Sequence, residues 1–188
     1  MNNGSSPLRL ALALLTGALL LLTSTLAHAQ RAEASEASVK AAFLYKFAAY
    51  VEWPPDALAA GAPFTIEVIG SDAVAAELAQ IVPGRTAFGH AVEVKRLAEG
   101  EMPKGVQVLF VGGSNPGHYA AAIAAAQKGG ALVVTESEHG LDAGAAINFV
   151  EANEHVGFEV SLESAQRSGL HISSRMLAVA RRVVQKGA

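Results

Sequence analysis

The sequence predicts an α/β fold: a single three-layer domain in which a mixed sheet of about six strands has helices on both faces. Two observations predict it. Between residues 64 and 135, short apolar stretches alternate with helical patterns, which is typical of strand–helix–strand units. After residue 140 the pattern changes to two short strands joined by a polar turn, which is typical of an antiparallel hairpin.

The first 29 residues are expected to be a cleavable signal peptide. Arg9 and the amino terminus precede an uncharged apolar run, Leu10 to Leu22, which is the order found in secretory signals. This run is shorter than the roughly twenty residues that cross a bilayer, and Ala27-His28-Ala29 supplies the small residues of a cleavage site. We therefore expect a periplasmic protein, cleaved after Ala29 and not embedded in the membrane.

Composition argues against a nucleic-acid-binding protein and against a disulfide-bonded or lipid-anchored one. Without Arg9, thirteen basic residues face seventeen acidic ones, so the net charge of the exported chain is 13 − 17 = −4, which argues against nucleic-acid binding. The chain has no cysteine, so it has neither disulfides nor the cysteine that accepts a lipid anchor.

The first helix of the domain is predicted from apolar residues at helical spacing that begin at Val39. Residues 30–38 are expected to be a flexible lead, and the domain to cover residues 39–188. Prolines at positions 54 and 55 end the helix, because neither can donate a backbone hydrogen bond. Its aromatic face carries Phe43, Phe47 and Tyr50, and we expect two of these three to fill the core.

The remaining elements follow from periodicity and from turn residues. Strands are predicted over residues 64–69, 91–97, 106–111, 131–135, 145–150 and 156–161. Helices are predicted over residues 73–82, 116–128 and 162–168, and a last helix is expected after Ser173 or Ser174, running to about Val184.

No pattern in the sequence indicates catalysis. The five histidines after residue 29 stand alone, without the pairs that bind metals, and neither a Gly-x-Ser-x-Gly nor a Ser-x-x-Lys motif is present. We predict no catalytic residues, no metal site and no cofactor. One turn, Gly112 to Asn115, joins a strand to a helix and is a candidate anion site, but an ordinary turn with a helix cap is the favoured interpretation.

Two binding interpretations stay open. The first is a protein-binding regulator that uses the aromatic helix face and the hairpin turn, with Trp53 as an exposed anchor. Its candidate residues are Trp53, Tyr50, Glu151, Asn153 and His155. The second is a sensor of small, amino-acid-like molecules, in which Arg85, Glu151 and Arg167 line a cleft at the sheet edge. Glu163 joins Arg85 and Arg167 in its candidate ligand-binding set.

Four segments together resemble the YfiR family. They are KAAFLYKFAAYVEWP from Lys40, PGRTAFGHAVEVKRL from Pro83, VQVLFVG from Val106 and INFVEANEHVGFEVSLESAQRSGLHISSRML from Ile147. The resemblance covers nearly all of the chain after the leader. It implies a periplasmic protein that binds the periplasmic part of an inner-membrane diguanylate cyclase and holds the enzyme inactive, which limits cyclic di-GMP and biofilm growth.

The resemblance also implies further partners. An outer-membrane lipoprotein with a peptidoglycan-binding domain sequesters the repressor in that system, and the resemblance is compatible with a homodimer. Because the family includes members with no known cyclase, a sensor kinase with a periplasmic domain is the alternative inner-membrane partner. The chain departs from the family in one respect: it lacks the cysteines of the best-known member, so redox control is not carried over.

Overall fold

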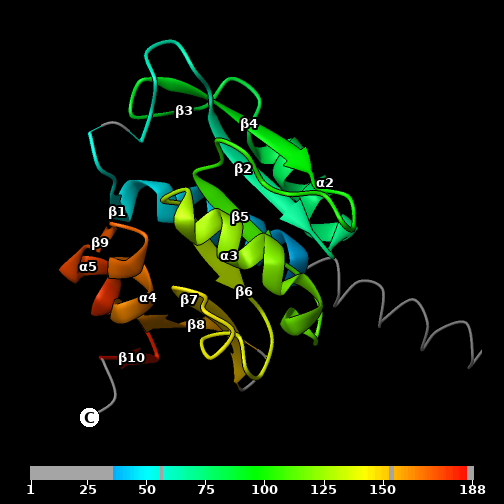
Figure 1. Ribbon diagram of the computed structural model, residues 1–188, viewed down its shortest axis with the longest axis vertical. Coiled ribbons are helices and arrows are strands. Elements are labelled where there is room, and N and C mark those ends of the chain that lie inside the picture. Colours follow the sequence, from blue (N-terminus) through cyan, green and yellow to red (C-terminus); the bar gives the residue numbers. More distant parts are fainter. Residues whose placement is uncertain (1–35, 56, 153–154, 186–188) are drawn as a thin grey trace, which may run out of the picture. The chain divides into compact units, whose positions relative to one another are not determined.

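An eight-stranded mixed sheet forms the centre of the fold (Figure 1), with the strand order β10-β8-β7-β6-β5-β2-β4-β3. The structure, a computed structural model, describes residues 36–55, 57–152 and 155–185. The expected signal peptide and most of the expected lead lie outside these residues. The strands of the sheet are β2 (Phe64–Ile69), β3 (Thr86–Ala87), β4 (His90–Arg96), β5 (Val108–Val111), β6 (Leu132–Thr135), β7 (Ile147–Ala152), β8 (His155–Ser161) and β10 (Arg182–Val184).

The predicted α/β class is confirmed, with more strands than the expected six. Strands β4, β2, β5, β6 and β7 are parallel, whereas β3 runs antiparallel to β4 and β8 runs antiparallel to β7. The two edge strands of the sheet, β3 and β10, are the two that were not expected, because strands of two and three residues leave no periodic signal. A separate antiparallel pair joins β1 (Val51–Glu52) to β9 (His171–Ile172).

Helices cover both faces of the sheet, as the sequence predicts. One face packs against the helix of residues 36–47 and against α2 (Asp72–Ile81), around side chains such as Phe47, Phe64 and Phe110. The other face packs against α3 (Ala120–Lys128), which follows the short 3-10 helix η2 (Pro116–Tyr119). Among the described residues, no helix is long and apolar enough to span a bilayer.

The first helix ends earlier than expected. It gives way at Phe47 to a 3-10 turn, η1 (Ala48–Tyr50), and then to β1. Pairing with β9 explains this, because Val51 lies opposite Ile172 and the backbone N–H of Ser173 donates to the carbonyl of Tyr50 at 2.9 Å. The prediction for the core is confirmed: Phe47 is buried, Phe43 is half-buried, and Tyr50 is 41% exposed.

The expected last helix is wrong in its second half. Ser173 caps α5, but α5 covers only Ser174–Leu177, and β10 follows and pairs in parallel with β8. The guanidinium of Arg182 donates two hydrogen bonds to Glu159 of β8, at 2.8 and 2.7 Å. Cross-strand pairing therefore outweighs the helical spacing of the apolar residues in this segment.

The β7–β8 hairpin is longer than expected. Strand β7 continues through Glu151 to Ala152, and β8 starts at His155, so these three residues belong to strands rather than to the turn. The helix α4 (Leu162–Arg167) then follows β8 directly, with the Ser161 side chain accepting a hydrogen bond from the backbone N–H of Ser164. Gly169, with φ of +70°, ends this segment as predicted.

Candidate functional site

The usual ligand site of a doubly wound sheet is closed in this fold. Such sheets bind ligands at the carboxyl ends of the strands where the strand order reverses, which here is between β2 and β5. Gly70 and Gly112 follow these two strands. A Cβ on Gly70 would lie 2.6 Å from the carbonyl oxygen of Gly112, and a Cβ on Gly112 would lie 2.6 Å from Cβ of Ser71. The two loops therefore touch, without room for a ligand between them.

A carboxylate of the protein itself occupies the turn that the sequence offers as an anion site. The backbone N–H of Gly113 donates to Oε1 of Glu136 at 2.7 Å, and Nζ of Lys40 donates to Oε2 of the same carboxylate at 2.5 Å. The side chains of Lys40 and Glu136 are only 11% and 16% exposed. The turn thus binds an internal anion, which supports its interpretation as a structural feature.

A surface around Tyr50 is the strongest candidate site. Two cavities, of about 270 and 420 Å³, lie beside each other, and both are lined by Lys46 and Tyr50. The exposed apolar residues Phe88 and Val179, which are 56% and 69% exposed, each line one of them. We call this region the Tyr50 surface and define it by Phe43, Lys46, Tyr50, Phe88, Arg175 and Val179.

Aromatic contacts support the floor of the Tyr50 surface. The ring of Phe43 lies 5.7 Å from Phe47 and 5.7 Å from Phe158, measured between centroids. On the other side of Tyr50, Phe88 lies 5.7 Å from Trp53. Rings in such contacts are held in place, so the surface offers a partner preformed apolar pockets.

Phe88 also has an unusual backbone. Its φ is +53°, and it is the one residue other than glycine with a positive φ in the described part of the chain. A bulky residue in this region costs roughly 1–3 kcal/mol, and residues with such strain cluster at functional sites. The strained turn between β3 and β4 holds the phenyl ring at the surface, beside the larger cavity.

The candidate partner-binding residues are only partly gathered at this surface. Tyr50 is central to it. Trp53 is half-buried between Phe64 and Phe88, with its indole nitrogen buried, so the expectation that it is an exposed anchor is wrong. Glu151 and His155 are exposed on β7 and β8, and Asn153 lies outside the described residues.

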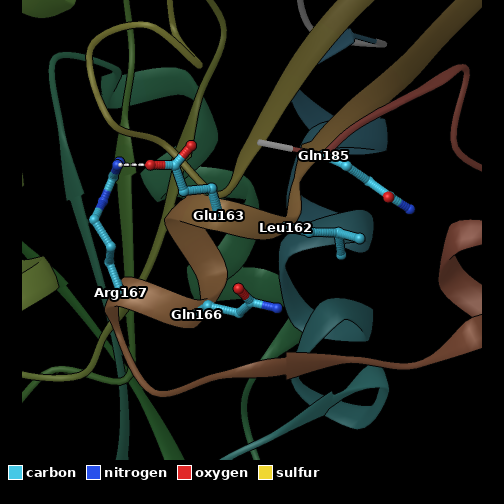
Figure 2. Close-up of a pocket in the computed structure, with 5 residues that line it drawn as sticks. All are labelled: Leu162, Glu163, Gln166, Arg167 and Gln185. Carbon is cyan, nitrogen blue, oxygen red and sulfur yellow. Dashed lines mark hydrogen bonds and ion pairs between the residues drawn. The ribbon is translucent and has the colours of Figure 1, made fainter. Parts of the chain in front are cut away.

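A second cavity region adjoins α4 and contains two candidate ligand-binding residues (Figure 2). It measures about 730 Å³ and is lined by Leu162, Glu163, Gln166, Arg167 and Gln185. The guanidinium of Arg167 donates to Glu163 Oε1 at 3.2 Å and to Ser164 Oγ at 2.8 Å. Arg167 and Glu163 are thus an ion pair one helical turn apart on α4.

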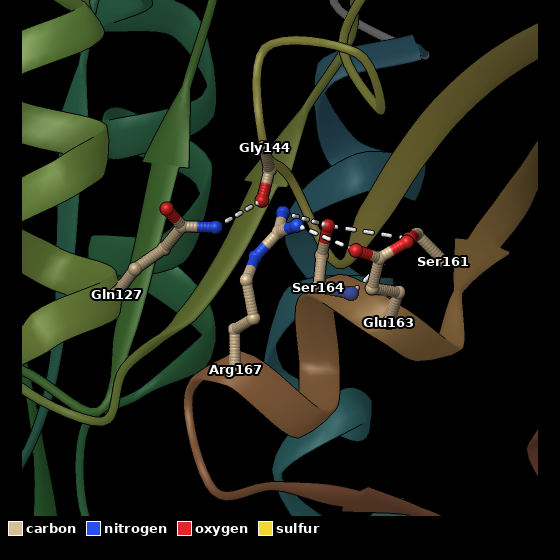
Figure 3. A network of polar contacts seen from close by, with 6 residues as sticks. All are labelled: Gln127, Gly144, Ser161, Glu163, Ser164 and Arg167. Atoms are coloured by element: carbon tan, nitrogen blue, oxygen red, sulfur yellow. Dashed lines mark hydrogen bonds and ion pairs between the residues drawn. The ribbon is translucent and has the colours of Figure 1, made fainter. Parts of the chain in front are cut away.

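Figure 3 shows how this region is held. Ser161 caps α4 and contacts Ser164, which in turn accepts from Arg167, while Gln127 of α3 donates to the carbonyl of Gly144. The guanidinium is therefore oriented by Glu163 and Ser164 of its own helix, and about half of the Arg167 side chain is exposed. An external carboxylate would replace Glu163 as its partner.

Arg85 does not line the cavity beside α4 that contains Arg167. Its Nε donates to the carbonyl of Ile81 at 2.6 Å, and its guanidinium lies 5.1 Å from the centroid of the Tyr45 ring. Five strand spacings separate β3, which follows Arg85, from β7, which carries Glu151. At about 4.8 Å per spacing, these two residues lie roughly 24 Å apart across the sheet, too far to line one small cleft.

One buried acid stands apart from both sites. Glu67 on β2 is 7% exposed, and its Oε2 has no hydrogen-bond partner among the described residues. Burial raises the pKa of this carboxyl, against the opposing effect of Lys95 on the neighbouring strand. No three residues of the types His, Cys, Asp and Glu are grouped to hold a metal ion in the described part of the chain.

Comparison with known proteins decides the family. A family model described as YfiR/HmsC-like matches residues 37–181, which is most of the chain. The chain belongs to the YfiR/HmsC-like family. The match contains the whole Tyr50 surface and α4, and of the residues that line the cavity beside α4 it leaves out Gln185. No curated protein matches the sequence.

Solved structures resemble this YfiR/HmsC-like chain only distantly. One is an ABC domain in complex with L-Trp from Streptococcus pneumonia, with 12% identity and a TM-score of 0.46, covering 64% of this chain and 55% of that one. Another is a conserved domain protein from Vibrio cholerae, with 14% identity and a TM-score of 0.44, covering 64% of this chain and 54% of that one. The chain thus matches little more than half the length of each.

Proposed function

We propose that this protein is a periplasmic regulatory binding protein that represses a membrane-bound diguanylate cyclase by contacting its periplasmic domain. Membership of the YfiR/HmsC-like family supports the regulatory role. The signal peptide predicted over residues 1–29 supports export, and a protein outside the cytoplasm reaches cytoplasmic signalling only through a partner that crosses the membrane.

The observation that carries the proposal is the exposed aromatic and apolar Tyr50 surface. A tyrosine that is 41% exposed, a strained phenylalanine that is 56% exposed and a valine that is 69% exposed line adjoining cavities. Protein interfaces are built around such aromatic anchors and pockets. An outer-membrane lipoprotein that sequesters the repressor is a second expected partner, and it would compete for the protein with the cyclase.

Co-expression tests this function. The chain is produced together with a diguanylate cyclase that has a periplasmic domain and comes from the same genome, and cyclic di-GMP is measured. The wild type lowers cyclic di-GMP, and Tyr50→Glu abolishes this effect because a carboxylate is placed in the apolar contact. Met102→Glu is the matched control, since Met102 is 46% exposed on the β4–β5 connection.

Two results would count against repression through this surface. Unchanged cyclic di-GMP with the wild type, together with no co-purification of the cyclase, removes the cyclase as partner. Equal repression by Tyr50→Glu and Met102→Glu moves the contact away from the Tyr50 surface.

The α4 cavity favours a second candidate function, the binding of a small, amino-acid-like molecule. A half-exposed guanidinium held by Glu163 and Ser164 can exchange its internal carboxylate for that of a ligand. Screening amino acids by thermal shift tests it. A ligand stabilises the wild type and not Arg167→Gln, whereas Arg85→Gln keeps the shift, because Arg85 contacts Ile81 and Tyr45 instead. A shift that survives Arg167→Gln refutes this site.

A further inference from the structure

Resting on the protein-binding function above, we propose that the occupant of the Tyr50 surface is an acidic amphipathic helix of the partner protein, which places apolar side chains in both cavities. The two cavities lie on either side of a ridge made by Lys46 and Tyr50, since both residues line both cavities. A partner that spans the ridge therefore fills two pockets and brings its polar groups to the Lys46 ammonium.

Charge selects an acidic partner. The described residues that line the two cavities include Lys46 and Arg175 and no acidic side chain. Arg85 adds a third cation, because its guanidinium lies over Tyr45, which lines the larger cavity. This local excess of positive charge occurs on a chain of net charge −3, so carboxylates are drawn to this face rather than to the rest of the protein.

The same charges disfavour a second copy of this chain. In a symmetric dimer each surface meets an identical surface, so Lys46 and Arg175 of one protomer would face the region of like charges on the other. Among the described residues that line the two cavities, none is a carboxylate that could face Lys46 or Arg175, so a partner has to supply one.

The spacing of the surface residues favours a helix as the occupant. Val39, Phe43, Lys46 and Tyr50 succeed one another at intervals of four, three and four residues along the first helix and its 3-10 extension. Such spacing aligns side chains in one stripe, along which a second helix packs with its own apolar residues at similar intervals. Val39 is 40% exposed, so the stripe continues beyond the cavities.

A pair of synthetic peptides tests the inference on the purified exported chain. Both peptides have about five helical turns with Leu along one face, and the remaining positions carry Glu and Ala in one and Lys and Ala in the other. Trp53 is the single tryptophan and contacts Phe88, so its fluorescence reports on occupancy, and calorimetry gives the affinity independently. We expect the acidic peptide to bind at least about tenfold more tightly than the basic one.

Charge reversal supplies the matched comparison. Lys46→Glu combined with Arg175→Glu should reverse the preference, so that the basic peptide binds more tightly. Lys104→Glu combined with Lys128→Glu makes the same change of net charge at exposed positions outside the surface, and should keep the preference for the acidic peptide. Circular dichroism of each variant verifies that it is folded.

Three results would overturn the inference. They are equal affinity for both peptides, loss of preference in the Lys104 and Lys128 control, and a wild-type dimer that Tyr50→Glu converts to a monomer. The last result would make a second copy the occupant. The two failures can be told apart. If the proposed function is wrong, cyclic di-GMP is unchanged on co-expression. If only the acidic helix is wrong, the protein still lowers cyclic di-GMP but does not prefer the acidic peptide.

Discussion

The ion pair between Lys40 and Glu136 should make a large and strongly coupled contribution to stability. It ties the first helix to the segment after β6, and the Glu136 carboxylate also accepts the backbone N–H of Gly113. Removing one member of a buried pair leaves the other charge uncompensated, at a cost of roughly 3–5 kcal/mol. Because the side chains remain 11% and 16% exposed, we expect the lower end, about 3 kcal/mol for Lys40→Met.

The two substitutions should not add. Glu136→Gln keeps an acceptor for Gly113 but removes the charge that faces Lys40, and should cost about 2–3 kcal/mol. The double variant removes both charges and should lose about 3 kcal/mol rather than the sum, a coupling of roughly 2–3 kcal/mol. For a domain of this size, Lys40→Met should melt about 6–12 °C lower and Glu136→Gln about 4–12 °C lower.

Urea unfolding followed by circular dichroism measures these values, with Lys104→Met as a control. Lys104 is exposed, so its substitution should change the unfolding free energy by less than about 0.5 kcal/mol. Additive losses in the double variant would refute the reasoning, because they would show that the two charges do not depend on each other in the folded protein.

Three further predictions concern the sheet. Gly140→Ala should cost several kcal/mol in urea unfolding or prevent folding, because its Cβ would overlap the Oγ1 atom of Thr135, at 2.0 Å. Gly157→Ala should displace the side chain of Arg181, whose Nε lies 2.1 Å from the position of the new Cβ. Because Arg181 is exposed and can move away, the loss in urea unfolding should be about 1 kcal/mol. Burial raises the pKa of Glu67 above its ordinary 4.5, so the contribution of Glu67 to stability is present at low pH and is lost as pH rises through the raised pKa. Glu67→Gln should therefore stabilise the protein at neutral pH and flatten the pH dependence of its unfolding free energy; no change in that dependence would contradict the assignment.

Sequence periodicity predicted the central strands because they are buried on both faces. The apolar runs at β2, β5 and β6 have little other explanation, and each lies in the middle of the sheet. It failed where pairing decides the conformation. The segment of β10 has helical spacing, yet its bidentate contact with Glu159 and its backbone pairing with β8 make it a strand.

The candidate site was predictable only in part, because it combines distant segments. The helix pattern predicted that one of Phe43, Phe47 and Tyr50 lies outside the core, but it did not indicate that this residue is Tyr50. Phe88 and Arg175 come from the β3–β4 turn and from α5, and no local signal places either beside Tyr50. Lys46 had a signal, since it lies on the same helix between Phe43 and Tyr50 and interrupts an otherwise apolar stripe.

The closed strand ends and the Tyr50 surface have a physical connection. Next to the closed loops after β2 and β5, the backbone N–H of Gly113 binds the protein's own Glu136 carboxylate, and that carboxylate accepts a hydrogen bond from Lys40 of the first helix. The same helix carries Phe43 and Lys46 of the Tyr50 surface. The turn after β5 thus helps to fix the helix that carries part of the Tyr50 surface. Lys40→Met should therefore weaken partner binding although Lys40 does not line either cavity, because a looser helix no longer holds the two pockets in register.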